Sequence, residues 1–246
     1  MIPGKASLRQ AEGMSEPEPQ ADRDLAPVAV LLGDRARVAM LAALADGRAL
    51  PAGELARRAG IHPATATAHL RRLVDGGLVR VRAQGRHRYH ELASPQVAAA
   101  LEALAQIAPP APIRSLRQHS AASALAEART CYDHLAGRRG VELRDRLLAA
   151  GALRVADDRD HVLTPRGEQL VIGLGVDLAG LGTSRRVFAR ACLDWTERRP
   201  HLAGALPAAL TARFLDGGWL TPAVSRAVRA APDYDRRLDE WLTSPG

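Results

Sequence analysis

Apolar residues return at helical spacing between Leu25 and about Ala45, where Asp46-Gly47 ends the run and Gly33-Asp34 interrupts it. Side chains three and four positions apart share one face of a helix, so the pattern predicts one or two helices. Residues 1–24 show no such periodicity and are rich in Pro, Glu and Gln. We expect them to form a disordered tail.

Two further short helices are predicted in the segment PAGELARRAGIHPATATAHLRRLVDGGLV. Gly60-Ile61 divides them, because glycine permits the turn, and His62-Pro63 starts the second helix with proline at its first position. Ala56 supplies a small residue where the helices would cross, and Leu70 and Leu73 give the second helix a buried face. The pattern is typical of a helix-turn-helix.

Two strands are predicted next, from Leu78 to Val81 and from Tyr89 to Leu92, with the polar segment 82–88 between them as a hairpin tip. Ser94-Pro95 then opens a helix with an apolar face. A cluster of prolines at 109, 110 and 112 stops that helix and marks a domain boundary. We therefore expect a winged helix-turn-helix domain over residues 25–108 and a second domain over residues 113–246.

The second domain contains an internal similarity. Residues 134–153 align without gaps on residues 201–220, with nine identities in twenty positions. Each copy is followed by a short region typical of a hairpin and then by a helical pattern. We expect two degenerate copies of a winged-helix-like unit, over about 131–176 and 198–242. The predicted fold is mainly α with short β-hairpin wings.

The net charge of +7 comes almost entirely from arginine, and Lys5 is the only lysine. Between residues 25 and 93 there are eleven arginines and five acidic residues, a net charge of +6. A basic segment suits a phosphate-rich partner, although an Arg- and Ala-rich composition also accompanies a GC-rich genome. The charge is therefore informative because it coincides with the predicted helix-turn-helix.

The second helix of that motif has an outward face on which Thr67 and Arg71 lie, with Thr65 and Arg72 beside it. Short side chains allow a helix to enter the major groove deeply, and Arg71 can reach a guanine edge or a phosphate. Basic residues at the predicted hairpin tip are suited to a minor groove or a DNA backbone. They are Arg86, His87 and Arg88.

The segment ELARRAGIHPATATAHLRRLVDGGLVRVRAQGRHRYHEL resembles the arsenic-repressor (ArsR/SmtB-like) winged-helix regulators, and the likeness covers about Leu25 to Ile107. It implies a homodimer, paired through the first and last helices of this segment, that binds a palindromic operator and represses until an effector releases it. It also implies which residues read the DNA, namely Thr65, Thr67, His69, Arg71 and Arg72.

The sequence departs from the metal-sensing members of that family. Residues 54–59, on the first helix of the motif, contain no cysteine, and the predicted helix 95–107 contains neither aspartate nor histidine. We therefore expect neither of the family's familiar metal sites. The phrases CYDHLAG and CLDWTERRPHLAG resemble the C-terminal region of a long subgroup of these regulators.

Two cysteines and two histidines in those phrases are candidate ligands. Cys131 and His134 are three positions apart, which suits one helical face or a helix start, and Cys192 and His201 would join them if the two copies pack with pseudo-symmetry. Such a site would hold a soft metal or metalloid. Alternatively, the cysteines are buried core residues and the histidines are helix caps or core side chains.

Two other effector classes remain open. A cysteine beside arginine or a helix N-terminus can sense an oxidant or another thiol-reactive species. A small-molecule effector could instead bind against Tyr132 and Trp195.

Other protein classes are poorly supported. Two widely separated cysteines do not form a disulfide scaffold, and there is no signal peptide or long apolar run, so we expect a cytoplasmic protein without a membrane partner. There is no phosphate-binding glycine loop, nucleophile elbow or paired-carboxylate motif, so we expect no enzymatic activity. The sequence predicts a regulator that binds double-stranded DNA. The alternative is a winged-helix module for protein interaction.

Overall fold

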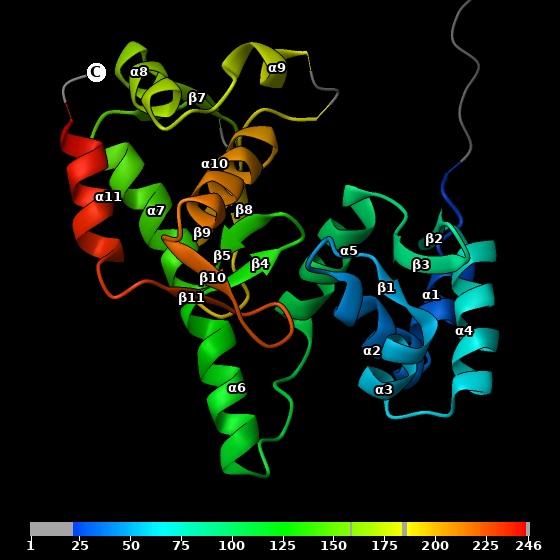
Figure 1. The fold of residues 1–246 in the computed structure, drawn as a ribbon. Helices are drawn as coiled ribbons and strands as arrows, with labels where there is room; N and C mark the ends of the chain where they lie inside the picture. Colours follow the sequence, from blue (N-terminus) through cyan, green and yellow to red (C-terminus); the bar gives the residue numbers. More distant parts are fainter. Residues whose placement is uncertain (1–21, 158, 184–185, 245–246) are drawn as a thin grey trace, which may run out of the picture.

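The computed structural model describes residues 22–157, 159–183 and 186–244, which pack around two hydrophobic cores (Figure 1). The tail expected at residues 1–24 lies almost entirely outside the described residues. Among the described helices, none combines the length and the apolar character that crossing a membrane requires.

The first core is built by helices and a small sheet between residues 26 and 107. Its elements are α1 (Ala26–Leu32), α2 (Arg35–Leu44), β1 (Leu50–Pro51), α3 (Ala52–Ala59), α4 (Pro63–Asp75), β2 (Val79–Gln84), β3 (His87–Leu92) and α5 (Pro95–Ile107).

The predicted helix boundaries in this region are confirmed. Asp34 separates α1 from α2 and caps α2, because its side chain accepts a hydrogen bond from the backbone N–H of Arg37. Gly60 ends α3 with a φ of 67°, a left-handed conformation that glycine adopts without strain. Ser94 caps α5 by accepting from the N–H of Val97. Local capping chemistry therefore fixes where the chain turns.

The three strands form one antiparallel sheet in the order β1-β3-β2. The predicted loop at 82–88 is wrong in extent, because pairing continues from Val79–Leu92 to Gln84–His87 and leaves only Gly85 and Arg86 at the tip. Cross-strand pairing therefore extends both strands through these polar residues. The two-residue strand β1 was not predicted; it is too short to show an alternating pattern.

The second core is built from residues 128–242. After α6 (Leu116–Glu127), its elements are β4 (Arg129–Cys131), β5 (His134–Ala136), α7 (Arg138–Ala149), β6 (Leu153–Val155), β7 (His161–Leu163), α8 (Pro165–Gly173), α9 (Leu178–Gly182), β8 (Arg190–Leu193), β9 (Pro200–Ala203), α10 (Ala205–Asp216), β10 (Leu220–Pro222), β11 (Val228–Ala230) and α11 (Tyr234–Thr243).

The order hairpin, helix, hairpin, helix occurs twice in this region, first over β4–α8 and then over β8–α11. Each unit therefore begins somewhat earlier than expected, at Arg129 and at Arg190, with a hairpin that was not predicted. Phe214 anchors the core between them by stacking on Trp219, with ring centroids 4.8 Å apart. Trp241 packs edge-on against both rings and donates from Nε1 to the carbonyl of Leu170 at 2.9 Å. The second region is mostly helical with several hairpins.

The two parts touch through the turn between β4 and β5. The backbone N–H of Tyr132 donates to the carbonyl of Ala45, just after α2, at 2.8 Å, and the Tyr132 ring packs against the first core. Gly47 is needed here, because a Cβ at this position would lie 2.9 Å from the Tyr132 carbonyl oxygen. A second contact joins Arg226 to the buried Glu102 of α5.

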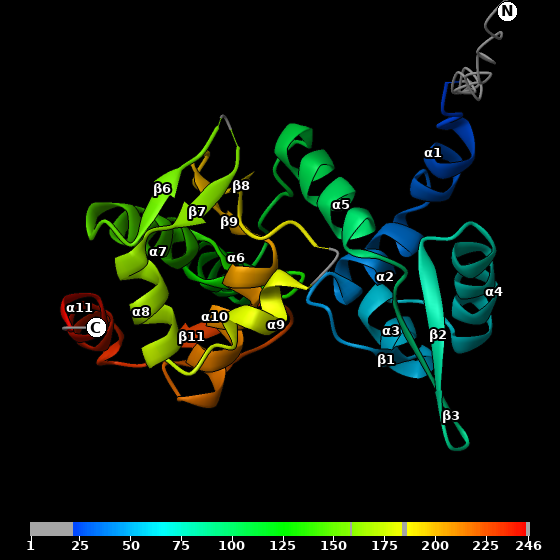
Figure 2. The ribbon, with the colours of Figure 1, turned by 90° about the horizontal axis from the view of Figure 1, so that it is seen from above.

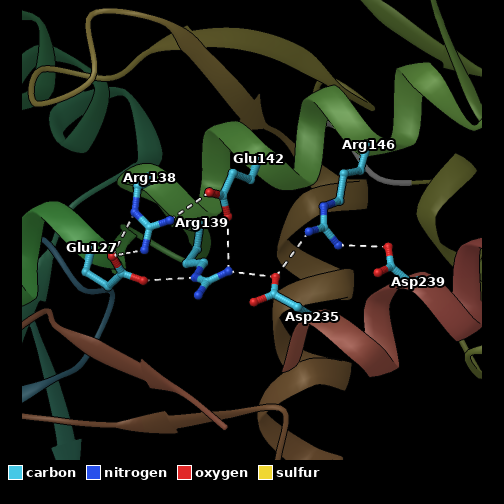
Figure 3. Close-up of polar contacts among 7 residues, drawn as sticks. All are labelled: Glu127, Arg138, Arg139, Glu142, Arg146, Asp235 and Asp239. Carbon is cyan, nitrogen blue, oxygen red and sulfur yellow. Dashed lines mark hydrogen bonds and ion pairs between the residues drawn. The ribbon is translucent and has the colours of Figure 1, made fainter. Parts of the chain in front are cut away.

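Ion pairs connect α6 and α11 to the intervening helix α7 (Figure 3). Glu127 at the end of α6 accepts from Arg138 and Arg139 at the start of α7. Arg139 also donates to Asp235 of α11 at 2.8 Å, and Arg146 reaches Asp235 and Asp239. The network fixes both helices to one face of α7.

Candidate functional site

The helix α4 has one buried face and one exposed face. Ala66, Leu70 and Leu73 pack into the first core. The exposed face carries four polar side chains, those of Thr65, Thr67, Arg71 and Arg72. The Arg71 side chain is 84% exposed. This helix lies at the side of the N-terminal part away from the second core (Figure 1).

His69 lies differently from the other residues predicted to read DNA. Its ring is half-buried and faces α2, where Nδ1 accepts from the Arg37 guanidinium at 3.3 Å. Arg37 is itself buried and donates to the carbonyls of Val30 and Leu31. His69 therefore helps to join α1, α2 and α4, and its position gives it a packing role.

The hairpin β2–β3 extends beside α4, as Figure 2 shows. Arg86 lies at the tip, and His87 and Arg88 lie on β3; all three are exposed. A groove lined in part by Thr67, Arg71 and Arg88 separates α4 from the sheet. The two basic elements thus border one surface.

The four candidate ligands of the second part meet in one cluster. The ligand atoms of Cys131, His134, Cys192 and His201 all lie within 4.8 Å of one another, and three of these residues are buried. The expectation that Cys131 and His134 share a helical face is wrong, since they are opposite partners in the β4–β5 hairpin. Cys192 and His201 are likewise partners in β8–β9. Each hairpin therefore contributes one thiol and one imidazole.

The two histidines face each other through the same ring nitrogen. Nε2 of His134 lies 3.3 Å from Nε2 of His201, and the rings stack with centroids 5.3 Å apart. Behind them, Nδ1 of His134 lies 3.4 Å from Asp133 and Nδ1 of His201 lies 3.4 Å from Asp194. A carboxylate beside Nδ1 favours the tautomer that carries its proton on Nδ1, which leaves the Nε2 lone pair available as a ligand.

Arginines neutralise both of these carboxylates. Asp133 accepts from Arg186 at 2.6 Å, and the fully buried Asp194 accepts from Arg129, also fully buried, at 2.9 Å. Asp194 also accepts a hydrogen bond from the backbone N–H of Gly137 at 2.7 Å. The carboxylates therefore orient the imidazoles without adding net charge to the cluster.

The cysteines behave as one thiol–thiolate pair. A hydrogen bond from Cys131, with further ones from His134 and His201, lowers the pKa of Cys192 to about 2. The hydrogen bond to Cys192 and burial raise the pKa of Cys131. Burial disfavours the charged form of His201, but its contacts with Asp194 and Cys192 outweigh burial and raise its pKa. Hydrogen bonding within the cluster therefore favours the thiolate form of Cys192 over that of Cys131.

Two thiols and two imidazoles can together bind a metal ion. The structure places Tyr132, one of the predicted effector residues, in the turn that joins two of these ligands. Trp195 lies elsewhere, beneath the Arg129 guanidinium at 4.4 Å from the ring centroid. Of the two aromatic residues, Tyr132 lines the cavity next to Cys131, His134 and Cys192.

Sequence reasoning missed the residues behind the ligands, which are Asp133, Asp194 and Arg129. A signal was present, because Ala-Arg precedes each cysteine by two or three positions, at 128–131 and at 189–192. That shared phrase corresponds to strands β4 and β8, which begin the two hairpins.

Comparison with known proteins agrees with the N-terminal geometry. Residues 32–82 match the model of a helix-turn-helix domain. The chain is 43% identical over 197 residues to the uncharacterized HTH-type transcriptional regulator YdfF of Bacillus subtilis, a match that covers 80% of this chain and 87% of that protein.

Solved structures match about a third of this chain. The homodimeric winged helix-turn-helix domain Mb0332 of Mycobacterium bovis, described as a possible ArsR-family regulator, is 33% identical, with a TM-score of 0.32, over 36% of this chain and 86% of that domain. HlyU from Vibrio cholerae is 27% identical, with a TM-score of 0.31, over 33% of this chain and 88% of that protein.

The match to YdfF extends far beyond the helix-turn-helix into the second region. The chain therefore belongs to the HTH-type transcriptional regulators, with a winged helix-turn-helix followed by a long C-terminal extension, and is a regulator rather than an enzyme.

Proposed function

We propose that this regulator is a homodimeric repressor that binds a specific operator through α4 and the β2–β3 wing and is released by an effector in its C-terminal region. The observation that carries the proposal is the exposed polar face of α4 beside an exposed basic hairpin. A helix of this kind fits the major groove, and basic residues beside it fit the phosphate backbone.

The proposed DNA contacts form two groups, which differ in the part of the duplex that they touch. Thr65, Thr67, Arg71 and Arg72 read base edges or adjacent phosphates from the major groove. Arg86, His87 and Arg88 contact the backbone or the neighbouring minor groove. His69 contributes indirectly, by holding α4 against Arg37 of α2.

The proposed dimer uses α1 and α5. Val30 is 71% exposed, Leu104 is 43% exposed and Ile107 is 82% exposed. An apolar hollow lined by Val28, Leu32, Leu104 and neighbouring residues runs between the two helices. A second copy of the same surface would cover these side chains and place two copies of α4 about one turn of duplex apart.

The proposed effector site is the Cys/His cluster. Its four ligands come from two hairpins that begin units of the same element order, and His201 follows His134 by 67 positions. We also propose that the two units are copies of one ancestral unit, since Gly137 and Gly204 both precede their helix with positive φ.

The alternative is that the winged region binds another protein. The two functions are separated by measuring the affinity for DNA from the protein's own promoter region and for random DNA of equal length at two salt concentrations. An operator-binding repressor prefers its promoter by at least about 1000-fold, with an affinity that falls steeply with salt. Equal, weak binding to both DNAs would contradict operator binding and favour a winged region that binds another protein.

A further inference from the structure

The Cys/His cluster has the composition of a four-coordinate site for a thiophilic divalent cation. Two nitrogen ligands about 2.0–2.1 Å from a tetrahedral zinc ion lie about 3.3 Å apart. The two Nε2 atoms are already 3.3 Å apart. All four ligand atoms lie within 4.8 Å of one another, so no pair needs to close by more than about 1.3 Å to reach the separation of two ligands of a tetrahedral zinc ion.

The charges in and around the cluster also favour a divalent cation. Two thiolates balance a divalent cation, and the nearby carboxylates Asp133 and Asp194 are already balanced by Arg186 and Arg129. A trivalent metalloid that prefers three thiolates finds only two here. Hard cations such as Mg²⁺ prefer oxygen ligands, which this cluster lacks.

The site is accessible to an ion. A cavity of about 210 Å³ reaches the cluster and is lined by Cys131, His134 and Cys192 on one side and by Gln96 and Ala99 of α5 on the other. The ligands thus lie at the junction with the helix that follows the DNA-binding wing.

The β4–β5 turn links the ligands to the DNA-binding region. Cys131 and His134 flank Tyr132, whose N–H is bonded to Ala45 and whose ring packs against the first core. Tyr132 has a φ of 62°, so this two-residue turn is held in a conformation that a tyrosine rarely adopts. Drawing Cys131 and His134 toward the opposite hairpin must therefore move, or strain, the contact between Tyr132 and Ala45.

We propose that Cys131, His134, Cys192 and His201 bind one zinc-type divalent cation, and that the bound ion lowers operator affinity by shifting the Tyr132 turn against the DNA-binding region. The site itself stands on its own geometry, whereas its effect on DNA rests on the proposed function.

Metal binding is tested with Co²⁺ as a spectroscopic probe on the full-length, metal-free, reduced protein. We expect one Co²⁺ per chain, with thiolate-to-metal charge transfer and the intense visible bands of tetrahedral Co²⁺, and displacement by Zn²⁺. Cys192→Ser and His201→Gln lose this spectrum, whereas His119→Gln, on the exposed face of α6, retains it. A wild-type protein without tetrahedral thiolate bands overturns the site.

Coupling is tested with Tyr132→Asn, because asparagine tolerates a positive φ and lacks the aromatic ring. Zinc should raise the operator Kd of the wild type by about tenfold or more, within the usual range of coupling free energies. Tyr132→Asn should bind Co²⁺ with the same spectrum, but zinc should change its operator Kd less than about threefold.

The outcomes separate the two proposals. Zinc binding without any change in operator affinity overturns the regulation and leaves the site. If zinc raises the affinity for the operator, release by the ion is wrong. If zinc weakens operator binding by Tyr132→Asn as much as by the wild type, the route through the β4–β5 turn is wrong. Failure of the metal-free protein to bind its operator overturns the proposed repressor, while the Co²⁺ spectrum still decides the metal site.

Discussion

Arg129 and Asp194 form a fully buried ion pair, with a guanidinium nitrogen 2.9 Å from a carboxylate oxygen. The pair joins β4 to the loop after β8, so it holds together the two hairpins of the Cys/His cluster. Arg129→Leu leaves the Asp194 carboxylate without its counter-ion, and we expect a loss of about 3–5 kcal/mol of stability. Chemical unfolding followed by tryptophan fluorescence measures this loss.

Arg190 provides the matched control, because it occupies the same place in the second Ala-Arg-x-Cys phrase but is exposed. Arg190→Leu should change stability by less than about 0.5 kcal/mol. Similar losses of stability for the two variants would mean that the buried Arg129–Asp194 pair stabilises the fold no more than an exposed arginine does.

Arg71 should contribute to operator binding through direct contact. Arg71→Ala should weaken binding by about 1–3 kcal/mol if the side chain reaches a base, without lowering the melting temperature. Fluorescence anisotropy across a salt series measures both the affinity and its salt dependence. Arg35→Ala, at the exposed start of α2, serves as a control for the loss of one positive charge.

Leu104 should be essential for dimerisation. Leu104→Glu places a charge in the apolar hollow of α1 and α5, so we expect a monomer in sedimentation experiments and about 100-fold weaker operator binding, as two linked half-sites become one. Val224→Glu alters a side chain that is 85% exposed in the β10–β11 loop. It should remain dimeric; a dimeric Leu104→Glu protein would contradict the proposed interface.

Gly47 should maintain the contact between the two parts of the chain. Gly47→Ala combines a φ of 74° with a Cβ only 2.9 Å from the Tyr132 oxygen, whereas Gly77→Ala has a similar φ of 70° and no atom within 4 Å. Backbone strain costs about 1–2 kcal/mol in both variants. Only Gly47→Ala should speed proteolysis of the linker 108–115, and equal cleavage of both would exclude a specific contact.

Glu127 should stabilise the protein in a pH-dependent way. Burial disfavours its carboxylate, but hydrogen bonds from Arg138 and Arg139 outweigh burial and lower its pKa below the ordinary value of 4.5. The depressed folded-state pKa means that this stabilisation is present above pH 4.5 and is lost as the pH falls through the lower value.

Glu127→Gln should therefore lower stability near pH 7 by at most about 1 kcal/mol, since the Glu127 side chain is 39% exposed and solvent screens its ion pairs. Melting curves at several pH values should show the difference shrinking below pH 4.5. Asp75→Asn removes a carboxylate 3.9 Å from Arg71 and provides a control. A difference for Glu127→Gln that persists unchanged into acid would exclude the ion pairs as its cause.

The N-terminal fold could be read from the sequence because its signals are local. Asp34, Gly60 and Ser94 act on neighbouring backbone groups, and the periodic leucines define each buried face. The orientation of His69 was not predictable in this way, since it depends on Arg37, 32 positions away. The sequence predicts wing strands that are too short, because the pairing of residues 82–84 with residues 87–89 depends on the facing strand and not on local polarity.

The cluster was only partly predictable. Similar phrases around Cys131 and Cys192 suggested that four ligands could meet, and the structure brings them together. A spacing of three fits either a helix face or a two-residue hairpin, and Tyr132-Asp133 lacks the glycine or asparagine that usually marks such a turn. Asp194 could not be assigned to His201, because their contact depends on how the β8–β9 loop folds back.

The ligands arrive at very different times as the chain is synthesised. Cys131 and His134 emerge from the ribosome with the DNA-binding region already complete, but their partners follow only after some 60 further residues. A polypeptide cut short before His201 would therefore carry every DNA contact and only part of the sensor. Such a fragment is expected to occupy the operator permanently, so loss of about the last fifth of the gene should give a dominant, unresponsive phenotype rather than simple loss of function.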